Sequence, residues 1–72
     1  MPSTVIRNYH YDPDARELTI TFVSGRKYIY FDVPHEKFSA FVHAPSRGPF
    51  FNREIRDAYN YREVIPLFDK AG

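Results

Sequence analysis

Hydrophobic and polar residues alternate along the first half of the chain, in the pattern of β-strands. Leu18, Ile20 and Phe22 are separated by more polar residues, which is typical of a strand with one buried face. The segments with strand character are residues 5–11, 17–22 and 27–31, and the turn signals between them are Asp12-Pro13-Asp14 and Ser24-Gly25. Because connections this short join antiparallel strands, the pattern predicts a three-stranded antiparallel meander.

The Ser24-Gly25 turn allows two registers for the second hairpin. A two-residue turn places Ile29 and Phe31 on the same face as the apolar residues of the middle strand. A three-residue turn places Tyr28 and Tyr30 there instead. We expect the three-residue turn, because glycine at its last position tolerates a positive φ without strain. Ile29 and Phe31 then lie on the opposite face, which is partly apolar and needs a cover.

Apolar residues recur at helical spacing in the second half of the chain. Phe38, Phe41 and Val42 follow Pro34 at i+4, i+7 and i+8 and form one stripe. Pro34 suits the first turn of this helix, and Ala44-Pro45 ends it.

A second helix is predicted after Ser46, which can cap it, with Pro49 in its first turn. Its apolar stripe consists of Phe51, Ile55, Ala58 and Tyr59. The chain is therefore expected to be an α+β protein in the order β-β-β-α-α, with both helices packed on one face of the sheet.

The C-terminal segment contains Val64, Ile65, Leu67 and Phe68, interrupted by Pro66. We assign residues 1–60 to the domain and residues 61–72 to a C-terminal tail. The tail has two interpretations: it folds back over the open sheet face, which we favour, or it is a segment that docks on a partner.

Composition limits the kind of protein this can be. A chain of 72 residues forms one domain, and its 6 Tyr and 7 Phe provide large side chains for a small core. Cysteine is absent, and no stretch approaches the roughly 20 apolar residues that span a bilayer. With no basic-then-apolar run at the N-terminus, we expect a cytoplasmic location. The net charge of +1 favours neither the presence nor the absence of an RNA partner.

The segment around the start of the second helix is the strongest candidate binding site. Free backbone N–H groups at a helix start suit a phosphate or carboxylate, and guanidinium groups grip phosphate bidentately. Arg26 and Lys27 form a second basic spot at the hairpin tip. The candidate nucleic-acid-binding residues are Arg47, Gly48, Asn52, Arg53, Arg56, Arg26 and Lys27.

Each of these features also has a purely structural interpretation. Ser46 can be only a cap, with Arg53 paired to Asp57 at i+4. Tyr28 and Tyr30 can stack on bases, but we favour a place for both rings in the core. The histidines lack metal-ligand spacing, so we expect no metal or other cofactor. No nucleophile, base and orienting residue form a set, so we do not expect an enzyme.

The order of several residues along the chain is that of a known family. The positions are Tyr11-Asp12-Pro13, Leu18, Phe22, Gly25, Tyr28-Ile29-Tyr30, Val33-Pro34, Ser46, Gly48, Phe50-Phe51-Asn52, Ile55-Arg56 and Tyr59. In them the chain resembles the KTSC domain, a small bacterial module found alone and at the C-terminus of some lysyl-tRNA synthetases. Pro45 and Pro49 depart from the family pattern, and the tail after Tyr61 lies outside the resemblance.

Two functions follow as hypotheses. The resemblance to a module of tRNA-charging enzymes implies a small non-catalytic domain that binds RNA. The alternative is a protein–protein interaction or self-association module, which would use the open sheet face with Ile29 and Phe31 and the apolar tail.

Overall fold

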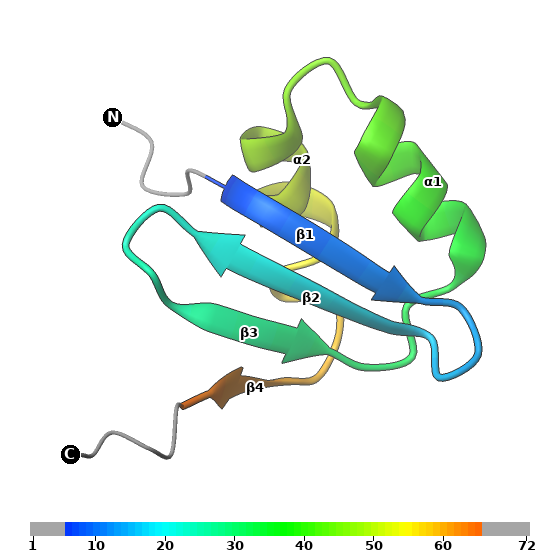
Figure 1. The fold of residues 1–72 in the computed structure, drawn as a ribbon. Helices are drawn as coiled ribbons and strands as arrows, with labels where there is room; N and C mark the ends of the chain where they lie inside the picture. The colour runs from blue at the N-terminus through cyan, green and yellow to red at the C-terminus, as the bar shows by residue number, and fades with distance from the viewer. Residues whose placement is uncertain (1–5, 66–72) are drawn as a thin grey trace, which may run out of the picture.

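The backbone forms a four-stranded antiparallel sheet with two helices on one of its faces (Figure 1). The computed structural model describes residues 6–65. Its elements are β1 (Ile6–Asp12), β2 (Glu17–Phe22), β3 (Lys27–Tyr30), α1 (His35–His43), α2 (Arg47–Glu54) and β4 (Tyr61–Val64). The α+β class is confirmed, but the predicted order is incomplete, because a fourth strand follows the helices and pairs with β3.

The register of the second hairpin is the one expected from a three-residue turn. Leu18 lies opposite Tyr30, and Ile20 lies opposite Tyr28. The Phe22 N–H donates to the Arg26 carbonyl at 2.8 Å, and Gly25 has a φ of 98°. A glycine with positive φ at the end of the turn thus puts both tyrosines on the helix-covered face.

The start of α1 differs from expectation by one residue. Pro34 is extended, with φ −64° and ψ 150°, and occupies the N-cap position rather than the first helical turn. At the other end, Ala44 is also extended, with ψ 142°, so the helix stops before Pro45 as predicted.

The second helix is shorter than its apolar stripe predicts. Ser46 occupies the N-cap position, but its side chain makes no capping hydrogen bond. The Arg56 N–H donates to the Phe51 carbonyl at 2.8 Å, one residue beyond the usual helical partner, and the helix ends at Glu54. Ala58 and Tyr59 therefore lie in the turns that lead to β4.

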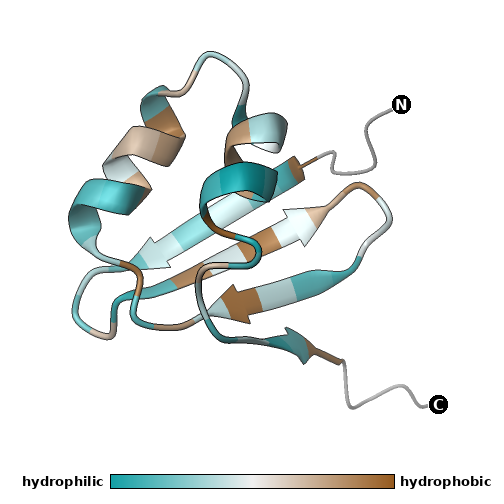
Figure 2. Cartoon of the chain, turned by 180° about the vertical axis from the view of Figure 1, so that it is seen from behind, coloured by the Kyte–Doolittle hydropathy of each residue, from teal (hydrophilic) through white to brown (hydrophobic). Residues whose placement is uncertain are grey.

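The core lies between the helices and the sheet. Its buried residues are Leu18, Ile20, Tyr30, Val33, Phe41, Phe51 and Ile55. Figure 2 shows hydrophobic and hydrophilic residues alternating along the central strands, so that one face meets the helices. Tyr11 closes one end of this core, because its hydroxyl donates to the Val33 carbonyl at 2.7 Å.

The first part of the predicted tail is a strand at the sheet edge. β4 lies beside β3, at the edge of the sheet away from α1 (Figure 1), and does not fold over the open face. Ile29 lies opposite Arg62 on that face, and within residues 6–65 no helix covers it. Leu67 and Phe68 lie outside the described residues. No helix in the described part of the chain is long and apolar enough to cross a membrane.

Candidate nucleic-acid interface

Three tyrosine rings lie side by side where β3 meets β4. Tyr28 and Tyr30 face the helices because of the hairpin register, and Tyr61 is paired directly with Tyr30. The Tyr61 ring centroid lies 5.3 Å from that of Tyr30 and 5.5 Å from that of Tyr28. The strand pairing therefore builds a continuous aromatic surface from residues that are far apart in the sequence.

This surface forms the floor of a cleft of about 350 Å³. Its aromatic lining consists of Phe22, Tyr28, Tyr30, Phe51 and Tyr61, and its polar lining consists of Ser24, Arg26, Arg56 and Asp57. Solvent exposure varies across the floor: Tyr30 is 3% exposed, whereas Tyr61 is 53% exposed. Tyr61 is thus the most exposed ring of the aromatic lining and the one most accessible to a ligand.

Charged groups stand on two sides of the cleft. Arg26 comes from the β2–β3 hairpin, and its Nε lies 3.9 Å from the Glu63 carboxylate. Its hydrogen bond with Tyr28 and the charge of Glu63 raise the pKa of Arg26. Arg56 comes from the turn after α2 and donates to Asn52 Oδ1 at 3.4 Å. Both guanidinium groups are exposed, and both remain charged at neutral pH.

The floor of the cleft also shifts the acidity of a hydroxyl group. Burial, followed by the neighbouring Tyr61 and Tyr28, raises the pKa of Tyr30 to about 12. The positive charge of Arg56 opposes this shift, and the negative charge of Asp57 adds to it. Tyr30 is therefore a neutral phenol at physiological pH.

The structure places the predicted arginines of α2 at different positions. Arg47 lies over the Tyr9 ring, with 5.4 Å between its Cζ and the ring centroid, and donates to the Val42 carbonyl at 3.2 Å. Gly48 is in the first turn of the same helix, and Asn52 is near its end, where it accepts from Arg56.

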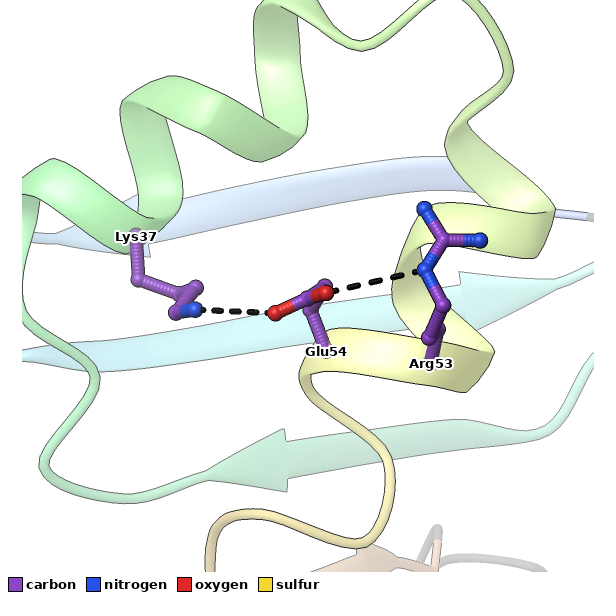
Figure 3. Close-up of polar contacts among 3 residues, drawn as sticks. All are labelled: Lys37, Arg53 and Glu54. Atoms are coloured by element: carbon purple, nitrogen blue, oxygen red, sulfur yellow. Dashed lines mark hydrogen bonds and ion pairs between the residues drawn. The ribbon is translucent and has the colours of Figure 1, made fainter.

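Arg53 belongs to an ion-pair chain that joins the two helices (Figure 3). Glu54 accepts from Lys37 of α1 at 3.2 Å and lies 3.6 Å from Arg53 Nε. Arg53 is thus paired with its neighbour rather than with Asp57, the partner considered from the sequence. The pair between Lys37 and Glu54 thus links α1 to α2 across their polar side.

Of the seven predicted residues, Arg26 and Arg56 line the cleft together. Lys27 does not, because it lies opposite Thr21 and Val64, on the face that points away from the helices. Two other lining residues, Tyr61 and Asp57, were not among the predicted site residues, and Asp57 was considered only as a partner for Arg53. Tyr61 and Glu63 are two residues apart, which is the spacing of side chains on one face of a strand. This signal for β4 was weak, because a four-residue segment with two charged residues does not indicate a strand. Within residues 6–65, no group of three or more histidine and acidic side chains could hold a metal ion.

Comparison with known proteins assigns the fold to a family. The family model described as the KTSC domain matches residues 2–59. The chain belongs to the KTSC domain family. This match ends just before β4, so Tyr61 lies beyond the part of this KTSC domain that the family model covers.

Relatives of this KTSC domain occur in two contexts. The chain is 36% identical over 59 residues to a lysine–tRNA ligase of Nostoc sp., which covers 82% of the chain but 10% of the ligase. It is 38% identical over 65 residues to an uncharacterised protein of Stutzerimonas stutzeri, covering 89% of the chain and 92% of that protein. The chain thus spans about a tenth of the length of the ligases it matches.

A solved structure is also similar. The crystal structure of a KTSC domain protein from Yersinia pestis superposes with a TM-score of 0.77 at 34% sequence identity. The match covers 89% of this chain and 93% of the other. The architecture of this KTSC domain is therefore that of a solved member of the family.

Proposed function

We propose that this KTSC domain is a non-catalytic module that binds single-stranded RNA, with one base stacked in the tyrosine cleft. The observation that carries the proposal is the position of Arg26 and Arg56 beside the exposed Tyr61 ring. Proteins that bind single strands combine aromatic rings for the bases with cations for the backbone. The cleft offers both in one place.

The dimensions of the cleft fit one base rather than a large ligand. A volume of about 350 Å³ is near the lower end of the range of small-molecule sites. Tyr61 and Tyr28 present aromatic surface, and stacking on such rings contributes roughly 1–3 kcal/mol per base. The base can therefore enter while the sugar and phosphates stay at the rim.

The two arginines at the rim are available for phosphate. The Arg26–Glu63 distance of 3.9 Å and the Arg56–Asn52 distance of 3.4 Å are both long. Exposed pairs of this kind contribute little to stability, so exchanging them for a phosphate contact is inexpensive.

Two further observations support a binding role. Curated relatives of this domain include ligases named for lysine and tRNA, so related domains occur in enzymes that handle RNA. The residues that line the cleft include neither histidine nor cysteine, and they suit recognition better than acid–base or nucleophilic chemistry. A cytoplasmic location fits the same proposal.

The test is a binding titration of fluorescein-labelled U7 RNA followed by anisotropy, at low and then physiological salt. We expect salt-sensitive binding, with the logarithm of affinity falling by about 0.7 per neutralised phosphate per decade of salt. Arg26→Gln and Arg56→Gln should each reduce this slope by about 0.7. Tyr61→Leu should weaken binding roughly tenfold with the slope unchanged, because it removes stacking only.

The matched control is Arg62→Gln, the next residue of β4 after Tyr61, which faces the opposite side of the sheet. It removes the same charge as Arg56→Gln, from the opposite face of the sheet, and should leave cleft binding nearly unchanged. If Arg62→Gln weakens binding as much as Arg56→Gln does, the RNA lies on the open face. If U7 does not bind even at low salt, the proposed function is wrong.

Self-association through the open sheet face is the second candidate. It is favoured by Ile29, a half-buried apolar residue on a face that no described helix covers. Sedimentation equilibrium over a wide concentration range tests it directly. A concentration-dependent dimer that Ile29→Lys abolishes would support this function, and a strict monomer would exclude it.

A further inference from the structure

Two adjacent residues give the rim of the cleft an acceptor and a donor side by side. Arg56 and Asp57 both line the cleft, in the turn that follows α2. Both charges are close enough to the floor to act on Tyr30, Arg56 lowering its pKa and Asp57 raising it. Among the described residues, the Asp57 carboxylate takes part in no ion pair or hydrogen bond, whereas Glu63 on the other side is paired with Arg26.

A free carboxylate has two oxygens that accept hydrogen bonds side by side. Of the four RNA bases, guanine alone presents two adjacent donors, N1–H and the N2 amino group, on its pairing edge. Its O6 lies next to these donors and accepts from a guanidinium group. Adenine and cytosine place an acceptor beside their amino donor, and uracil has one donor between two acceptors, so each would point a lone pair at a carboxylate.

We propose that the tyrosine cleft selects guanine, with the guanine pairing edge against Asp57 and Arg56 and the ring stacked on Tyr61. With guanine in the cleft, Arg56 exchanges its phosphate contact for the guanine O6, and Arg26 stays on the backbone. This selectivity rests on the proposed function, because the base arrives as part of a single-stranded RNA. Tyrosine stacking is tolerant of sequence and supplies affinity for any base. The Asp57 carboxylate discriminates between bases, because it accepts two adjacent hydrogen bonds from guanine alone. Its repulsion of phosphate is the same for every RNA and does not affect the preference.

The experiment compares U7 with heptamers that carry one guanine, adenine or inosine at the centre, titrated against the full chain. We expect the guanine heptamer to bind roughly tenfold more tightly than the adenine heptamer. The inosine heptamer should bind between the two, because inosine keeps the N1–H donor and O6 of guanine but lacks the N2 amino group. Equal affinities for guanine and adenine, or for guanine and inosine, would overturn the proposal while leaving RNA binding intact. Absence of any binding, including that of U7, would instead refute the proposed function.

Asp57→Asn tests the residue assignment. We expect the guanine preference to fall to within about twofold, and U7 binding to stay constant or tighten, because a charge that repels phosphate is removed. These opposite directions distinguish loss of recognition from loss of folding. Glu36→Gln on α1 removes an exposed carboxylate outside the cleft and should keep the full preference. A guanine preference that survives Asp57→Asn would contradict the assignment.

Titrations with GMP and AMP distinguish a free nucleotide from RNA as the source of the base. We expect GMP to shift the same NMR signals as the guanine heptamer, but with weaker affinity, since it brings one phosphate. GMP binding as tight as heptamer binding would make the cleft a mononucleotide site and would overturn selection within RNA.

Discussion

At the scale of single residues, positive φ angles fix the ends of three turns. Gly25 has a φ of 98°, Arg16 of 58° and Asp32 of 59°. One backbone hydrogen bond links the last two, because the N–H of the buried Val33, which follows Asp32, donates to the Arg16 carbonyl at 2.9 Å. A non-glycine residue in this region is strained by about 1–2 kcal/mol, so the fold tolerates the strain where a buried contact holds the chain.

Gly25→Ala should therefore destabilise the domain by about 1–2 kcal/mol. An added Cβ would meet nothing within 4 Å, so the cost is conformational rather than steric contact with a neighbour. Urea unfolding followed by circular dichroism measures the loss, and Gly25→Asn is the matched control because asparagine adopts positive φ more readily. Equal stability of Gly25→Ala and the parent would mean that the turn does not depend on this φ.

At the scale of elements, β4 joins the fold to the site. It pairs with β3, supplies Tyr61 to the cleft and places Glu63 beside Arg26. Removing it would expose the backbone groups of β3 as a new edge, beside the half-buried rings of Tyr28 and its neighbours. The strand thus protects the sheet and completes the site at the same time.

Two truncations isolate this role of β4. A chain ending at Ile65 keeps every residue of the sheet, whereas a chain ending at Asn60 lacks β4. We expect the shorter chain to unfold at lower urea concentration and to self-associate, since β3 becomes an unprotected edge. Sedimentation velocity and urea titration of the two chains measure this difference. Equal stability and a monomeric state for both would show that β3 needs no partner strand.

The same elements show how far the sequence predicts the structure. The meander and its register were predictable, because strict alternation in β2 and Gly25 in the turn are strong local signals. β4 was not predictable, because Arg62 and Glu63 at its centre are polar and backbone pairing with β3 defines it. The end of α2 was missed because Ala58 continues the apolar stripe past the point where the backbone turns away. The cleft depends on both features, so the sequence offered Arg26 and Arg56 as candidate site residues but did not indicate that they line one cleft.

At the scale of the whole molecule, one core joins the first three strands to both helices. Tyr30 of β3, Phe41 of α1 and Phe51 of α2 belong to a single buried cluster. Within residues 6–65 this cluster is the core that holds the sheet and the helices together, and a domain this small has little stability to spare. A perturbation at one buried group should therefore unfold the sheet and the helices together.

Ionisation of Tyr30 provides such a perturbation. Burial first, and then its tyrosine neighbours, raise the pKa of Tyr30 from its ordinary 10 to about 12 in the folded protein. The unfolded chain loses this proton at lower pH than the folded one. The free energy of unfolding therefore keeps its full value below pH 10, where Tyr30 is protonated in both states. It falls as the pH rises toward 12, by on the order of 2 kcal/mol. Urea unfolding at several values between pH 8 and 11.5 measures this loss.

Two phenylalanine variants separate Tyr30 from the other alkaline groups. Tyr30→Phe keeps the ring in the core without an ionisable hydroxyl, so its stability should depend less on pH above 10 than that of the parent. Tyr61→Phe removes a hydroxyl that adds to the raised pKa of Tyr30 but leaves Tyr30 buried, so it should reduce the alkaline loss less than Tyr30→Phe does. Strand and helix signals should be lost together in the parent, because both depend on the cluster that contains Tyr30. If Tyr30→Phe retains the full alkaline loss, the titrating group lies elsewhere, among the lysines or the more exposed tyrosines.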